Sequence, residues 1–306
     1  MKKIFAFATM LILSLSLSAQ TQMHIWMDGS TLKLSINEID SITFVDPNAS
    51  NPDTPDPDPT PDPSTDNGIG VFSIAEVKQV TFSKGNLQYH PANNIWRFAE
   101  KQTDCIGAAN SNISATYDGW LDLFGWSTSA TNFGVSSLTG RYDYSGNFLD
   151  WGVNQIGNDT ANTWRTLTKY EWSYMLSNRP NASSLYGVAQ VNGVNGLILL
   201  PDNWTCPSGV TFKSGFHSSL GVEYYAAYQT FTADQWSKLE SAGAVFLPAT
   251  GLRYGSNLYN SNGEYWSATE SDSDGANCLY FGPSEAGIGY CFRLSGHSVR
   301  LVKDLQ

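Results

Sequence analysis

Residues 264–302 read EYWSATESDSDGANCLYFGPSEAGIGYCFRLSGHSVRLV and decide the fold class. Short runs rich in aromatic and β-branched residues alternate here with polar turns, and they occupy residues 264–269, 277–281, 288–294 and 298–302. Runs of this length bounded by Gly, Ser, Asn and Asp predict β-strands. We therefore expect the chain to end in an antiparallel meander of strands.

Two segments upstream of this stretch predict helices, and both begin in the same way. Thr168 with Glu171, and Thr232 with Gln235, have the spacing of a capping box, in which each side chain bonds the backbone amide of the other residue. An apolar residue precedes each cap and a tryptophan follows it, which is the spacing of a hydrophobic staple. Gly243 is suited to end the second helix. Two helices followed by a late meander of strands predict an α+β domain.

The start of the chain has the pattern of a secretory signal peptide over residues 1–19. Two lysines precede an apolar run over residues 4–17, and small residues follow it. This run is shorter than the roughly 20 apolar residues that span a bilayer. The sequence therefore predicts export to the cell surface, the periplasm or the extracellular space, and no transmembrane segment is expected.

Three parts are expected after the signal peptide. Residues 20–46 predict a small β unit, with a hairpin around Asp28-Gly29 and a third strand at 42–45. Residues 47–68 are rich in Pro and Asp and contain no basic residue, which is typical of a disordered, extended linker. Residues 69–306 are long enough for one large domain, to which we assign the two helices and the late meander.

The balance of charges excludes one class of partner. The formal net charge is −11, and nucleic-acid phosphates require a basic face, so no nucleic-acid partner is expected. Charged residues make up only 15% of the chain, whereas it contains 15 Tyr and 10 Trp. Recognition loops use Tyr with Ser, Asn and Gly because these residues combine contact area with adaptable hydrogen bonds. Ordinary exported β-rich proteins share this composition, so both interpretations stay open.

Several motifs in the last half of the chain resemble a known group of domains. They are WRTLTKYEWSYML at 164–176, LPDNWTCPSG at 200–209, FLPATGLR at 246–253, EYWSATE at 264–270 and GHSVRLVKD at 296–304. They resemble the exported paralogous domains of Fibrobacter and Bacteroidetes, which are similar to the C-type lectin-like fold and to the formylglycine-generating, sulfatase-modifying superfamily. The resemblance covers Val71 to Asp304. It implies a C-type lectin-like domain whose ligand surface is built from late loops and strands, at about Arg253 to Arg293.

Catalytic and metal-binding interpretations are weaker, and no cofactor or metal is expected. The formylglycine-generating relatives use a late pair of cysteines, and Cys278 and Cys291 form the only late pair here, without the surrounding motif. Two thiolates without a third ligand make a poor metal site. The acidic loop at 270–277 lacks the usual calcium-lectin signatures, and the histidines, including His217 and His297, lie in no recognised catalytic motif. The sequence therefore favours a protein that is not an enzyme.

The late cysteines predict a disulfide instead. If 277–281 and 288–292 pair as a hairpin with its loop at 282–287, Phe281 faces Ile288 and Cys278 faces Cys291. Export makes oxidation plausible. Cys105 and Cys206 are then left, either as a second bridge or as buried free thiols.

Alternation along this hairpin predicts a core face and a solvent face. We expect Leu279, Phe281, Ile288, Phe292 and Leu294 in the core, and Tyr280, Arg293 and the disulfide toward solvent. A Gly- and Asn-rich loop and an acidic loop lie nearby in the sequence. We therefore predict one polar and aromatic ligand-binding patch made by Tyr254, Asn257, Tyr259, Asn260, Asp272, Asp274, Tyr280 and Arg293.

The main functional hypothesis is a secreted or cell-surface adhesion module. Its ligand would be a glycan or a protein, on a host or a neighbouring cell. A structural subunit of a surface appendage and a formylglycine-generating-type oxidoreductase are the alternatives. The Tyr- and Asn-rich surface before the closing SVRLV would also suit a target of a diversity-generating retroelement, although a fixed binding surface is the simpler interpretation.

Overall fold

The computed structural model describes residues 70–112, 114–135, 144–216, 228–259 and 262–305, with the backbone of 22–27 and 30–35. The chain divides into two compact units, Met1–Asp62 and Pro63–Gln306. In the first unit, β1 (Gln22–Met27) and β2 (Ser30–Ser35) pair as an antiparallel hairpin, as predicted. The signal peptide, the third strand at 42–45 and the linker lie outside the described residues.

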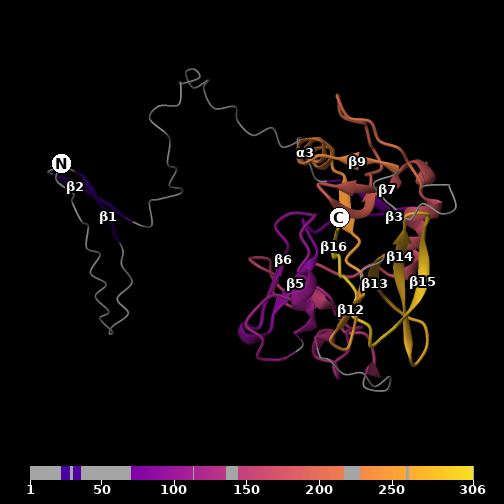
Figure 1. The fold of residues 1–306 in the computed structure, drawn as a ribbon, viewed down its shortest axis with the longest axis horizontal. Helices are drawn as coiled ribbons and strands as arrows, with labels where there is room; N and C mark the ends of the chain where they lie inside the picture. The colour runs from indigo at the N-terminus through magenta and orange to yellow at the C-terminus, as the bar shows by residue number, and fades with distance from the viewer. Residues whose placement is uncertain are drawn as a thin grey trace, which may run out of the picture. The chain divides into compact units, whose positions relative to one another are not determined.

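The second unit is a mixed α+β structure made mostly of small sheets (Figure 1). Its helices are α1 (Lys169–Ser173), continued by a π-helical turn η7 (Tyr174–Asn178), and α3 (Ala233–Ser241), with short 3-10 turns η2 (Pro91–Asn93), η3 (Gly107–Ser111), η4 (Asn132–Gly134), η6 (Trp151–Val153) and η8 (Ala182–Ser184). Its strands are β3 (Phe72–Ala75), β4 (Lys78–Phe82), β5 (Leu87–His90), β6 (Ile95–Phe98), β7 (Tyr186–Val191), β8 (Val194–Leu199), β9 (Thr230–Phe231), β10 (Val245–Pro248), β11 (Leu252–Tyr254), β12 (Asn257–Tyr259), β13 (Gly263–Glu270), β14 (Gly275–Gly282), β15 (Glu285–Phe292) and β16 (Val302–Asp304).

Both predicted helix starts are confirmed. The Thr168 side chain accepts from the Glu171 amide, and Glu171 bonds back to the Thr168 amide. Thr232 and Gln235 make the same exchange at the start of α3. Gly243 follows α3 with a φ of 89°, a left-handed conformation that favours glycine. None of the described helices has the length and apolar character needed to cross a membrane.

Strand β8 lies in the middle of a sheet ordered β10-β8-β7-β9 and is buried on both faces. Leu197 and Leu199 belong to one hydrophobic cluster, with Trp172 from α1. Ile198 belongs to another cluster, with Trp236 from α3. Each face of this strand packs against a hydrophobic cluster that includes a helix, so side chains on both faces must be apolar. This explains why polar and apolar residues do not alternate along the segment.

Three of the four predicted late strands form a sheet ordered β13-β14-β15, drawn in gold and yellow in Figure 1. The fourth, predicted at 298–302, is not part of it, because β16 begins only at Val302 and pairs with β4. Its middle strand, β14, has buried residues on both faces, whereas most of β15 is partly or fully exposed. Leu279 and Phe281 pack in the cluster with α1, whereas Trp266 and Cys278 pack in a cluster of aromatic residues from earlier in the chain. The prediction that the cysteine face points to solvent is therefore wrong. Its cover comes from Phe124, Trp126 and Trp151, which lie far from it in sequence.

The predicted bond between Cys278 and Cys291 is present, with the Cα atoms 6.1 Å apart. The predicted register is wrong by two residues. Cys278 lies opposite Gly289 and Cys291 lies opposite Ala276, so the disulfide crosses the strand pair diagonally. A shift of two keeps every side chain on its face, because the side-chain period of a strand is two. Cys105 and Cys206 are free and exposed rather than paired or buried.

Candidate functional site

The hairpin of β11 and β12 brings three of the predicted ligand-binding residues together. Tyr254 lies opposite Asn257, and Leu252 lies opposite Tyr259. Side chains opposite one another, and those two positions apart, share a face of the hairpin. Tyr254, Asn257 and Tyr259 therefore share one face, on which the tyrosines are 44% and 51% exposed. Asn260, the fourth predicted residue of this loop, lies outside the described residues.

A buried arginine fixes this hairpin from beneath. Arg253 points to the opposite face and is only 2% exposed. Its guanidinium donates to the carbonyls of Gly255, at 3.0 Å, and Leu123, at 3.4 Å. Its backbone bonds Gly296 in both directions. Desolvation by burial lowers the pKa of Arg253. The exposed tyrosines therefore stand on a hairpin whose other face is attached to the domain.

The acidic loop between β13 and β14 is a second, separate group. One carboxylate oxygen of Asp272 accepts from the amides of Asp274, at 2.9 Å, and Gly275, at 2.8 Å, and from the Tyr290 hydroxyl, at 3.2 Å. The pKa of Asp272 is lowered, chiefly by the hydrogen bond from the Asp274 amide. Asp272 thus shapes its own loop, and Asp274 takes part by its backbone.

An exposed aromatic pair beside this loop was missed by the sequence analysis. Tyr290 and Phe292 are each 47% exposed and meet edge to face, with ring centroids 5.6 Å apart. Phe292 was predicted to be core, and that prediction is wrong. Phe292 lies at the end of β15, opposite Gly275. A Cβ atom added to Gly275 would lie 2.1 Å from the Tyr290 ring. The available signal was Gly275, which has no side chain, so that the Tyr290 ring lies over it and meets Phe292 there.

Two other predicted binding residues are placed differently from the prediction. Tyr280 is only partly exposed, and its ring lies against Gly287 and Gly289 of the neighbouring strand. Arg293 is 1% exposed, so its prediction as a solvent-facing anchor is wrong. Its guanidinium lies 4.4 Å from the Trp126 ring and bonds Glu270 and several backbone carbonyls. Arg293 is thus a structural residue of the domain interior.

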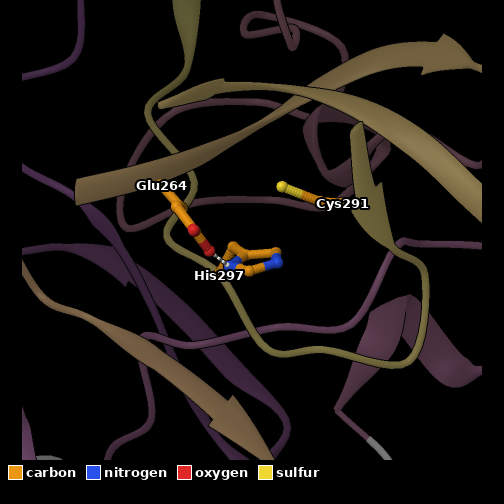
Figure 2. Close-up of side chains that lie close together, drawn as sticks. All are labelled: Glu264, Cys291 and His297. Atoms are coloured by element: carbon orange, nitrogen blue, oxygen red, sulfur yellow. Dashed lines mark ion pairs between the residues drawn. The ribbon is translucent and has the colours of Figure 1, made fainter. Parts of the chain in front are cut away.

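A cluster of Glu264, Cys291 and His297 is the strongest arrangement of metal-ligand types among the described residues (Figure 2). The sulfur of Cys291 is bonded to Cys278, so it offers no thiolate to an ion. Only a carboxylate and an imidazole are then left, which is too few for a structural zinc site. The imidazole of His297 is 1% exposed and meets the Trp266 ring edge to face, at 4.6 Å. These contacts support a role of His297 in packing.

Glu264 and His297 form a short contact of 2.8 Å between Oε2 and Nδ1. The two atoms lie within ion-pair distance but are not aligned as a hydrogen bond. Desolvation raises the pKa of Glu264, but the contact with His297 and its charge lower it by more, and the net pKa lies below its usual value. A carboxyl group with a depressed pKa stabilises the fold above its unfolded pKa of about 4.3, and this contribution is lost as the pH falls through the folded pKa.

Replacing Glu264 with Gln is therefore expected to destabilise the protein in a pH-dependent way. At pH 7 the E264Q variant should lose about 1–2 kcal/mol of unfolding free energy, because a buried imidazole loses its charged partner. The loss should shrink as the pH falls below about 4.3 and the wild-type carboxyl group is protonated. Urea unfolding across this pH range measures it. Glu285, exposed in the same sheet, gives the control E285Q. A loss at pH 7 that persists unchanged in acid would contradict the assignment.

The predicted patch is thus resolved into parts. Tyr254, Asn257 and Tyr259 share an exposed face, and Asp272 and Asp274 lie on another hairpin beside Tyr290 and Phe292. Tyr280 is half-buried and Arg293 belongs to the interior. No protein-family model matches the chain, and no curated protein or solved structure matches it either.

Proposed function

We propose that the protein is an exported, non-catalytic binding or adhesion module with a C-type lectin-like domain. Its ligand is a glycan or a protein on a host or neighbouring cell, and the late hairpins contact it. The described residues form a mixed α+β structure with two helices and a late three-stranded sheet, which agrees with the expected α+β class. The acidic chain and its many tyrosines favour recognition of such ligands over nucleic acid.

The observation that carries the proposal is the exposed face of the β11–β12 hairpin. Two tyrosines and an asparagine stand together there on a hairpin attached through Arg253. Tyrosine offers a large, rigid contact area at a low cost in conformational entropy, and asparagine adds hydrogen bonds. Because the hairpin is already fixed, little ordering would be needed when a ligand binds. The same reasoning applies to Tyr290 and Phe292 beside Asp272.

Replacing both Tyr254 and Tyr259 with Ala is expected to weaken ligand binding by about 2 kcal/mol or more, because exposed aromatic anchors dominate interfaces. Arrays of glycans and surface proteins, probed with the mature chain, identify the ligand, and its affinity for the double variant is then measured. Thermal unfolding should be nearly unchanged, since both side chains are largely outside the core.

Tyr170 provides the matched control, because it is 71% exposed and belongs to α1, not to the β11–β12 hairpin. The Y170A variant should bind as well as the wild type. If Y254A/Y259A keeps its affinity, or if Y170A loses as much, the hairpin face is not the binding surface.

A further inference from the structure

A cleft of about 570 Å³ opens on the second unit. None of the residues that line it belongs to the late hairpins. Its aromatic wall is formed by Phe82, Phe98 and Trp164, and charged side chains stand around it. Its volume falls within the roughly 300–1,000 Å³ of small-molecule sites.

The Trp164 ring is held in place and half-buried. Its indole Nε1 donates to the Asp159 carboxylate, at 2.9 Å, and the Phe98 ring meets it edge to face, at 5.0 Å. The next residue, Arg165, bonds Val302 of β16 through the backbone in both directions. Its guanidinium also forks to Glu171 and Asp304. The indole is therefore a preformed platform, with one edge fixed and part of its surface exposed.

Gln102, which also lines the cleft, is held in place as well. Gln102 is 6% exposed, and its amide nitrogen donates to Glu240, at 2.9 Å, and to the Ala244 carbonyl, at 3.1 Å. Its amide oxygen accepts from the Phe246 amide and from Arg300, both at 2.7 Å. Every polar atom of this side chain has a partner, so this part of the cleft keeps its shape without a ligand.

The charges around the cleft indicate what it would accept. Five charged residues line it, the acidic Glu100, Asp159 and Glu240 and the basic Lys84 and Lys303. With three carboxylates against two ammonium groups, the lining carries no positive excess to hold an anion. Carboxylates accept hydrogen bonds from hydroxyl groups, and ammonium groups donate to hydroxyl oxygens. An apolar ring face beside such groups suits a ligand with an apolar face and many hydroxyl groups.

We propose that this cleft binds a short neutral oligosaccharide, with one sugar ring stacked on Trp164 and its hydroxyl groups bonded to the surrounding carboxylates and lysines. The site is separate from the surface assigned to the late hairpins. It gives the domain a second binding site that depends on different residues.

The test titrates the mature chain with neutral trisaccharides of glucose, galactose, mannose and N-acetylglucosamine at millimolar concentration, and with a galacturonic acid trisaccharide as the anionic probe. Calorimetry and tryptophan fluorescence report binding. At least one neutral trisaccharide is expected to bind, and the anionic one more weakly. W164A should weaken binding about tenfold or more, equivalent to about 1.4 kcal/mol. W164F should keep most of the affinity, which separates stacking from misfolding.

Trp120 gives the matched control, because it is half-buried and lies outside the cleft, against Arg97. W120A and Y254A/Y259A should both bind the trisaccharide as the wild type does, so failure of the hairpin surface and failure of the cleft can be told apart. The proposal is overturned if no neutral trisaccharide binds, if W164A binds as tightly as the wild type, or if the galacturonic acid probe binds best.

Discussion

Removing the Cys278–Cys291 bond in a C278A/C291A variant is expected to lower the free energy of unfolding by about 3 kcal/mol. The cysteines are 13 residues apart in sequence, and a bond that closes a loop of this size restricts the unfolded chain. Both residues are nearly inaccessible, 1% and 8% exposed, and both pack in the aromatic cluster behind the late sheet. The lost sulfur contacts should add to the effect.

Urea unfolding of the oxidised wild type and the variant measures this difference. The chain supplies its own control in Cys105 and Cys206, which are free and exposed. A C105A/C206A variant should change stability by less than about 0.5 kcal/mol, as surface substitutions usually do. Equal losses in the two double variants, or free thiols at Cys278 and Cys291 in the unreduced protein, would contradict the assignment.

The sequence predicts this bond but not its register, and the difference comes from the length of the turn. The expected loop covers residues 282–287, whereas the hairpin closes with Gly282 opposite Glu285, so only Pro283 and Ser284 form the turn. Two-residue turns are the commonest hairpin connections. The disulfide prediction survived because a shift of two residues leaves both cysteines on the same face.

Local and tertiary features differed in how well they could be predicted. The capping boxes at Thr168 and Thr232 depend on side chains three residues apart, and both were predicted correctly. Which face of the late sheet is covered depends on Phe124, Trp126 and Trp151, more than a hundred residues earlier in the chain. Alternation along a strand cannot reveal such a cover, so Arg293 and the disulfide were placed toward solvent. The β11–β12 face was found because its tyrosines lie in one short hairpin.

Replacing Arg293 with Met is expected to lower the free energy of unfolding by about 3 kcal/mol or more. The guanidinium donates to the carbonyls of Gly275, at 3.3 Å, of Tyr144, at 3.2 Å, and of Gly146, at 3.4 Å. It also bonds the Asp272 carbonyl and the Glu270 carboxylate. One side chain thus joins the acidic loop to a distant segment, and methionine can replace its volume but none of its hydrogen bonds.

Two further variants separate a structural role from a role in ligand binding. E270Q should cost about 1 kcal/mol or less, because the Glu270 side chain is 53% exposed and solvent screens its charge. R293K should remain destabilised, since an ammonium group cannot reproduce the planar fork that reaches several carbonyls at once. Thermal and urea unfolding rank the three. A wild-type-like stability of R293M, with ligand binding alone reduced, would restore Arg293 as an exposed anchor and contradict its place in the interior.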